Sequence, residues 1–164
     1  MRDASVLARL LTELNEAVGA SGVPPGAGSA PDNVIVSEEE MGERLLAVTA
    51  FETVLLAERE GNALGFVSIR ILPYLDQGVP FAEVTDMYVV PGDRRIGVAT
   101  ALMSKAEEFA LRQGCTSVHL ITANENAGAQ SFYLASGYEP LYVGFERFLD
   151  AEATQAEKGQ SVGA

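Results

Sequence analysis

The order of sequence patterns along the chain predicts a single mixed α/β domain. Its 164 residues are enough for one domain with one hydrophobic core. Apolar residues at helical spacing come first, two strand-like segments follow around a turn, and strands and helices then alternate towards the C-terminus. Such a succession is typical of helices packed against a central sheet.

The N-terminal part predicts two helices joined by a loop. Residues 4–18 form the first helix, because their apolar residues recur at three- and four-residue spacings and fall on one face. Residues 19–33 are rich in Gly and Pro and predict a loop. A second helix is expected to begin at Ser37, because Ser37 and Glu40 form a capping box at its positive end.

The middle of the chain predicts three strands. Residues 51–60 and 63–72 form a hairpin around Gly61-Asn62. Residues 81–90 form a third strand, which ends at Pro91 because proline has no N–H to donate to a sheet.

The C-terminal part predicts alternating helices and strands. We expect a helix over residues 97–113, a strand over 117–122, a short helix over 127–136, and one or two strands over 140–149. Residues 150–164 are small and polar and are expected to be a disordered tail, so the domain covers residues 1–149.

Composition narrows the classes of partner. The chain has 23 Asp and Glu against 11 Lys and Arg, a net charge of -12, which argues against nucleic acid and suits a cationic substrate. Cys115 stands alone, so no disulfide can form within the chain. The apolar runs are shorter than the roughly 18 residues of a membrane-spanning helix, and no secretory signal opens the chain. We therefore expect a cytoplasmic protein that does not bind membranes.

The turn after the third strand is the most informative segment. It carries Arg94 and Arg95 into the start of a helix, whose unpaired N–H groups and positive dipole end favour an anion such as phosphate. Gly97 and Ala99 are small enough for a diphosphate to approach the backbone. The segment is not a P-loop, because Val98 stands where that motif has Lys. The alternative is an ordinary strand–helix connection with solvated arginines.

Two segments resemble the signature sequences of the GNAT superfamily, the acetyl-CoA-dependent N-acetyltransferases. Residues 94–99 (RRIGVA) fit its R/Q-x-x-G-x-G/A sequence, and residues 126–138 (NAGAQSFYLASGY) fit its N-x-x-A-x-x-F-Y-x-x-x-G-F/Y segment. The resemblance covers residues 37–149 well and implies a mixed, mostly antiparallel central sheet flanked by helices. The family's first strand is expected to be short or missing, because only three residues precede the first helix.

The resemblance implies that acetyl-CoA binds along the third strand and the turn after it. The pantetheine arm is expected to lie beside the strand like an extra strand, where an N–H near Val89 would polarise the thioester carbonyl. The diphosphate is expected on the backbone amides of the helix start. The implied cofactor-binding residues are Met87, Tyr88, Val89, Arg94, Arg95, Ile96, Gly97, Val98, Ala99, Thr100, Asn126 and Tyr133. No metal is expected, since no cluster of potential ligands has metal-site spacing.

The resemblance also implies direct transfer of the acetyl group to a primary amine in a ternary complex. Glu83 matches the family's catalytic glutamate and is the favoured base, and Asp86 is the second candidate. Tyr133 matches the tyrosine that protonates the departing thiolate. Regular alternation would turn Glu83 and Asp86 to opposite faces of their strand, unless a bulge re-aims it.

Two alternatives stay open. A non-catalytic acyl-CoA-binding or sensory module would keep the cofactor site without the acceptor chemistry, and a plain structural domain would have neither. His119 and Cys115 are expected to be packed residues rather than catalytic ones. The acceptor, a small cationic molecule or a peptide amine, does not follow from these patterns. Neither does the oligomeric state, although homodimers are common in the family.

Overall fold

The structure, a computed structural model, describes residues 2–20, 51–74, 76 and 78–145. Its elements in chain order are α1 (Arg2–Ala20), β1 (Glu52–Arg59), β2 (Asn62–Pro73), β3 (Pro80–Val89), a 3-10 turn (Pro91–Asp93), α3 (Val98–Arg112), β4 (Val118–Leu120) and α4 (Ala127–Ala135). The four strands form one sheet in the order β1-β2-β3-β4. The pairs β1–β2 and β2–β3 are antiparallel, whereas β3 and β4 are parallel. The predicted mixed α/β fold is confirmed.

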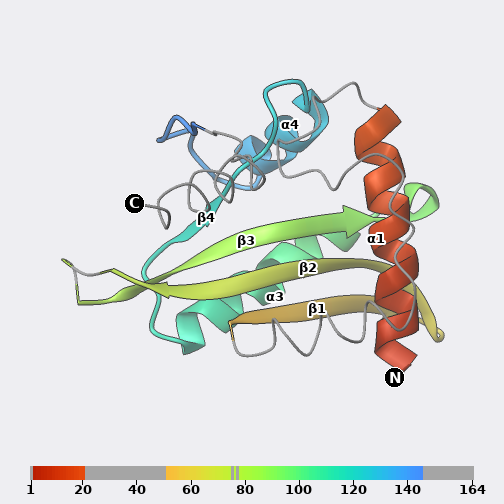
Figure 1. The fold of residues 1–164 in the computed structure, drawn as a ribbon, viewed down its shortest axis with the longest axis horizontal. Coiled ribbons are helices and arrows are strands. Elements are labelled where there is room, and N and C mark those ends of the chain that lie inside the picture. The colour runs from red at the N-terminus through yellow and green to blue at the C-terminus, as the bar shows by residue number, and fades with distance from the viewer. Residues whose placement is uncertain (1, 21–50, 75, 77, 146–164) are drawn as a thin grey trace, which may run out of the picture.

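The helices cover the two faces of the sheet separately (Figure 1). Helix α1 crosses one face and α3 lies on the other. No strand precedes α1 within the described residues, in agreement with the expected short or missing first strand.

Three predicted segments differ from the structure. The hairpin turn is Glu60-Gly61, one residue earlier than predicted, because these two residues have the positive φ angles, 53° and 82°, that a tight two-residue turn requires. β4 has three residues instead of six, because it pairs with β3 only briefly. Residues 140–145 form no strand, since they pair with none of the described strands. Residues 21–33, the helix from Ser37 and the tail lie outside the described part of the chain.

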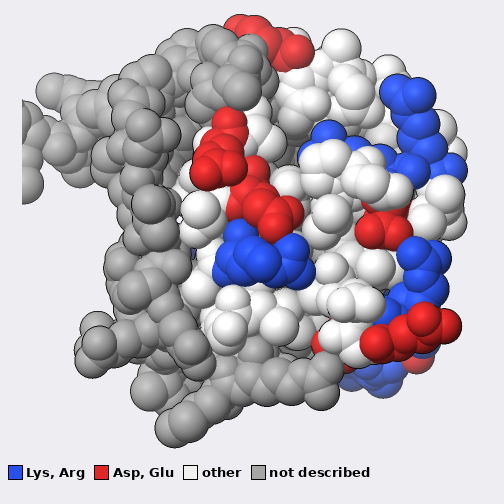
Figure 2. Space-filling view, turned by 90° about the vertical axis from the view of Figure 1, so that its right-hand side faces the viewer, with Lys and Arg blue, Asp and Glu red and all other residues white. Residues whose placement is uncertain are grey.

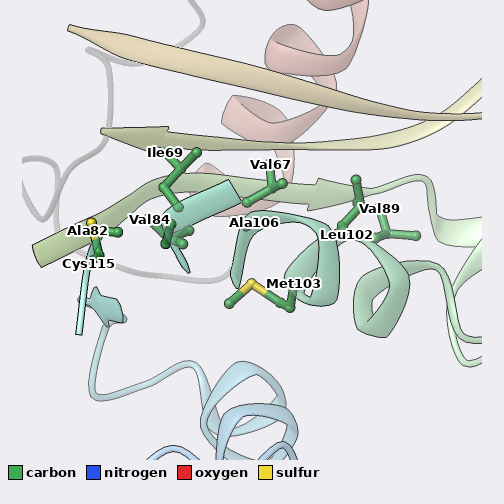
Figure 3. Close-up of a cluster of buried hydrophobic side chains, with 10 residues drawn as sticks. Val67, Ile69, Ala82, Val84, Val89, Leu102, Met103, Ala106 and Cys115 are labelled. Atoms are coloured by element: carbon green, nitrogen blue, oxygen red, sulfur yellow. The ribbon is translucent and has the colours of Figure 1, made fainter. Parts of the chain in front are cut away.

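Two clusters of buried side chains hold the helices to the sheet. The α3-side core joins aliphatic residues of β2 and β3 to one face of α3 (Figure 3). Its buried members are Val67, Ile69, Ala82, Val84, Val89, Leu102, Met103, Ala106, Ala110 and Cys115. The α1-side core packs α1 against the opposite face of the sheet, and its buried members are Ala4, Leu7, Ala8, Leu10, Ala63, Phe66 and Tyr88.

Candidate active site

A β-bulge interrupts the pairing of β2 with β3. Ser68 pairs with Asp86 and Ile69 pairs with Val84, so Thr85 has no partner on β2. One extra residue in a strand shifts the alternation of the following side chains by one position. Odd-numbered residues before the bulge and even-numbered residues after it therefore point to the same face of the sheet.

This shift turns two carboxylates to the same face of the sheet. Before the bulge, Val84 belongs to the α3-side core, which leaves Glu83 on the α1 side. After the bulge, Val89 belongs to the α3-side core and Tyr88 to the α1-side core, so Asp86 also lies on the α1 side. The opposite orientation expected from regular alternation is therefore wrong, and the exception of a bulge applies.

Asp86 lies beside a second carboxylate, Glu52 at the start of β1. Glu52 accepts hydrogen bonds from the hydroxyls of Ser68, at 2.6 Å, and of Thr85. Burial raises the pKa of Asp86, and the Glu52 carboxylate raises it further. A carboxylate with a raised pKa is better suited than an ordinary one to accept a proton near neutral pH.

The sequence patterns did not single out Glu52. Alternation along β1 gives it a face, but the pairing of β1 with β2 is needed to bring it to Ser68 and the bulge. An acidic residue at the start of a strand with an apolar centre, residues 54–57, was the available signal.

Glu83 is held by an arginine on the neighbouring strand. Both Nε and a terminal nitrogen of Arg70 contact the same carboxylate oxygen of Glu83, at 2.6 and 2.5 Å. Arg70 pairs in register with Glu52 as well, and Glu83 pairs with His119 on β4. Four ionisable side chains thus cross the sheet in one row, next to the bulge.

The strands β3 and β4 diverge immediately after this row. Their pairing ends at Val84 and Leu120, while β3 continues to Val89 without a strand on that side among the described residues (Figure 1). The N–H of Val90 donates to Leu64 on the β2 side at 2.9 Å. Because backbone groups alternate between the two edges of a strand, Met87 and Val89 present theirs to the open side.

The turn between β3 and α3 leads into a helix start that no side chain caps. Gly97 is the N-cap residue with a φ of 91°, which favours glycine, and no side chain bonds to the helix start. The first hydrogen bond of the helix runs from the Ala101 N–H to the Gly97 oxygen. The N–H groups of Val98, Ala99 and Thr100 therefore precede the regular helical bonds and lie at the positive dipole end.

The two arginines of this turn differ in their surroundings. Arg94 bonds through Nε to the Val89 oxygen at 2.9 Å, and its guanidinium lies 5.7 Å from the centre of the Tyr88 ring. Arg95 has a φ of 62° and is exposed. The predicted cofactor residues from 87 to 89 and from 94 to 100 are thus continuous in space at the end of β3.

Helix α4 begins after Asn126 and places Tyr133 on the α3 side of the sheet. Asn126 is the N-cap of α4, and its side chain accepts a hydrogen bond from the Ala129 N–H at 3.1 Å. Tyr133 packs against the α3-side core, between the rings of Phe132 and Tyr138. Burial raises the pKa of Tyr133, so its hydroxyl keeps its proton at neutral pH. Tyr133 and the carboxylates therefore occupy opposite faces of the sheet.

A cavity of about 270 Å³ lies between α3 and α4. It is lined by Thr100, Met103, Ser104, Glu107, Phe132, Ala135 and Ser136. The cavity extends along α3 from Thr100, in the first turn of the helix, to Glu107. At its other end, Glu107 accepts a hydrogen bond from the Tyr138 hydroxyl at 2.9 Å.

Charges of both signs lie side by side on the face of the molecule drawn in Figure 2. Two of the ion pairs among the described residues, Arg9–Glu13 and Arg59–Asp93, are both 2.8 Å long. The net charge of -12 is thus not gathered into one acidic surface on this face.

The other candidate residues are packed, as expected. The His119 ring lies 4.8 Å from that of Phe81 and 5.6 Å from that of Tyr142, and its Nε2 is 3.2 Å from the Ser117 hydroxyl. Cys115 is buried, and burial raises the pKa of its thiol. Within the described residues, no three His, Cys, Asp or Glu side chains form a potential metal site. No described helix is long and apolar enough to span a membrane.

Comparison with known proteins places these features in one family. The chain is 40% identical over 83 residues to aminoglycoside N(6')-acetyltransferase type 1 of Klebsiella aerogenes, which covers 48% of this chain and 53% of that protein. It is 29% identical over 94 residues to the aminoalkylphosphonate N-acetyltransferase of Salmonella typhimurium, which covers 57% of this chain and 61% of that protein. The chain thus spans little more than half the length of these curated relatives.

A solved structure shares the fold. It is AAC(6')-Iy in complex with the bisubstrate analogue CoA-S-monomethyl-acetylneamine, with a TM-score of 0.65 and 24% identity, covering 90% of this chain and 92% of that chain. The sequence model of the acetyltransferase (GNAT) family matches residues 29–138. Because that match covers most of the chain, this protein belongs to the GNAT acetyltransferase family.

Proposed function

We propose that this protein transfers the acetyl group of acetyl-CoA to a primary amine by direct attack in a ternary complex. The observation that carries the proposal is the bulge at Thr85, which brings the half-buried Asp86 next to the open edge of β3. An acyl donor on that edge and a base beside it are the two requirements of direct amine acetylation.

The residues at the end of β3 suit the chemistry of acetyl-CoA. The N–H groups of Val98, Ala99 and Thr100 form an uncapped helix start, which binds a diphosphate well. The outward backbone groups of Met87 and Val89 suit an arm that carries amides. When bound, acetyl-CoA supplies the activated acyl thioester.

The proposed proton acceptor and proton donor lie on opposite faces of the sheet. We assign Asp86 as the base that accepts the amine proton, directly or through a water, because its pKa is raised and no ion pair holds its carboxylate among the described contacts. Glu83 was the favoured base from sequence, but its carboxylate is bound to Arg70. As the amine nitrogen bonds to the acetyl carbon, the carbon–sulfur bond breaks. Tyr133, on the opposite face, gives its proton to the leaving sulfur.

The acceptor we propose is a small cationic molecule or a peptide amine. Glu52 and Asp86 lie beside the Arg70–Glu83 ion pair on the α1 side, so three carboxylates face one guanidinium and can attract a cation before it is deprotonated. The names of the two relatives specify an aminoglycoside and an aminoalkylphosphonate, two different amines. The feature that these two substrate names share is an amine, which is the acceptor group we propose.

An amine panel tests the proposal. The protein is incubated with acetyl-CoA and single amines (aminoglycosides, polyamines, aminoalkylphosphonates and peptides), and free thiol release is followed. We expect turnover with at least one cationic amine. Acetyl-CoA should also raise the melting temperature, because a ligand that binds only the folded state stabilises it.

Two other results would favour the alternatives. A rise in melting temperature without acetylation of any amine would indicate a non-catalytic acyl-CoA-binding module. No rise with acetyl-CoA would indicate a structural domain and would contradict the proposed function.

A further inference from the structure

The Arg94 side chain occupies part of the edge of β3 on which the pantetheine arm is proposed to lie. Its Nε donates a hydrogen bond of 2.9 Å to the Val89 carbonyl oxygen. Its guanidinium lies over the Tyr88 ring, 5.7 Å from the centre, in a cation–π contact. Tyr88 is fixed in turn, because its hydroxyl donates to Glu13 of α1 at 3.1 Å. The Arg94 guanidinium is thus held against β3 by a hydrogen bond and by a cation–π contact.

The oxygen that Arg94 contacts belongs to the open edge of the strand. Val90 donates to Leu64 on β2, so Val89 directs its own N–H and C=O to the opposite edge. A ligand that joins this edge as an extra strand must donate an N–H to a carbonyl there. The Val89 oxygen is one of the two such acceptors between the bulge and Pro91, the other being that of Met87.

Arg94 also lies within reach of a stronger partner. It is three residues before Gly97, the N-cap of the helix whose start is the proposed diphosphate site. Arginine binds phosphate oxygens through paired, charge-assisted hydrogen bonds, which are stronger than a single bond to a neutral carbonyl. A diphosphate at this helix start would therefore compete with Val89 for the guanidinium.

We propose that Arg94 makes the enzyme selective for CoA thioesters over short thioesters that lack a diphosphate. It holds the Val89 carbonyl until a diphosphate at the start of α3 draws its guanidinium away and frees the edge. A CoA thioester frees the edge by its own binding, whereas a pantetheine thioester must displace Arg94 without that help. This inference rests on the proposed binding of acetyl-CoA along β3.

The test uses S-acetylpantetheine, which has the arm and the thioester but no diphosphate. The variant Arg94→Met keeps an aliphatic stem over Tyr88 and removes the hydrogen-bond donor. By NMR titration, we expect it to bind S-acetylpantetheine about three- to tenfold more tightly than the wild type, the range for the net contribution of one ordinary hydrogen bond, because Arg94 is exposed to water. Its affinity for acetyl-CoA should not increase, because the phosphate contact is lost.

Two further variants separate this role from simpler ones. Arg95→Met changes the exposed neighbour and should weaken acetyl-CoA binding without changing the affinity for S-acetylpantetheine. Arg94→Lys keeps the charge but lacks the planar Nε donor, and should gain S-acetylpantetheine affinity while retaining acetyl-CoA binding. A melting curve for each variant shows whether the turn is still folded.

Each remaining outcome decides the matter. If Arg94→Met binds S-acetylpantetheine with unchanged affinity, Arg94 does not compete with the pantetheine arm for the Val89 carbonyl, and the proposal is overturned. If the affinity falls, Arg94 merely supports the strand, which also overturns it. Failure of the wild type to bind acetyl-CoA would overturn the proposed function and this inference together, whereas binding without a gain in Arg94→Met overturns this inference alone.

Discussion

The two faces of the sheet are built by different rules. The α3 face is a continuous aliphatic surface, in which β2 and β3 contribute alternate residues to one core. The α1 face is apolar beneath α1, and away from this helix it carries a row of ionisable side chains that crosses all four strands beside a bulge. Regular periodicity therefore makes the core, and the proposed active site arises where the periodicity is broken. Changes to each face should have different consequences.

Removing the base is expected to have the largest effect. Asp86→Asn keeps the shape of the side chain but cannot accept a proton at neutral pH, so kcat should fall by about 10²- to 10⁴-fold. The affinity for acetyl-CoA should stay the same, since Asp86 faces the α1 side. Steady-state kinetics and calorimetric titration measure the two quantities.

Two matched variants show whether the loss is specific to Asp86. Glu108→Gln makes the same chemical change on the exposed face of α3, where Glu108 pairs with Lys105 and Arg112, and should leave kcat unchanged. Glu83→Gln releases Arg70 and should reduce kcat less than Asp86→Asn does. A larger loss in Glu83→Gln would reverse the assignment of the base.

Truncating the aliphatic face should reduce stability instead. Leu102 is 3% exposed in the α3-side core, so Leu102→Ala should lower the free energy of unfolding by about 2–5 kcal/mol. For a chain of this size that corresponds to a fall in melting temperature of roughly 4–20 °C. Denaturant unfolding and thermal melts check it, and kcat per folded molecule should change little. An equal loss of kcat in folded Leu102→Ala would contradict the separation of the two faces.

The same contrast explains how much could be predicted from the sequence. Helical spacings predicted α1 and α3, and turn and boundary residues predicted β1, β2, β3 and α4, all to within a few residues, because these signals are local in the sequence. The bulge at Thr85 had no such signal, since it exists only in the register between two strands. Glu52 was missed for that reason. Residues 140–145 have a strand-like pattern, but they lack a partner strand among the described residues.

Loss of the proposed acid should have a smaller effect than loss of the base. Tyr133→Phe removes the hydroxyl on the α3 side, and kcat should fall by about 10- to 100-fold, at or below the lower end of the range for general acid–base catalysis because water can partly replace the proton donor. The ring contacts with Phe132 and Tyr138 remain possible, so the melting temperature should barely change. Kinetics with a poor and a good thiol leaving group provide the check. Unchanged turnover would remove the acid role of Tyr133.

The smallest expected effect is that of Asp86→Asn on the free energy of unfolding, because the ionised Asp86 carboxylate beside Glu52 destabilises the fold. Because the pKa of Asp86 is raised, the folded protein holds its proton up to a higher pH than the unfolded chain does. The stabilising contribution of the protonated form is complete below the ordinary aspartate pKa of about 3.9, and it is lost as the pH rises through the higher folded-state pKa. Asp86→Asn should therefore be more stable than the wild type at pH 7, and the difference should disappear as the pH falls towards about 3.9.

Glu108→Gln is the control, and it should be less stable than the wild type at pH 7. Lys105 lowers the pKa of Glu108, so the ionised form of Glu108 stabilises the fold at neutral pH. Urea unfolding of the three proteins across this pH range measures the differences. If the gain in stability of Asp86→Asn did not vary with pH, its cause would be better packing and not the removal of a buried charge. The contrast between a face that stores charge and a face that is packed for stability would then be wrong at Asp86.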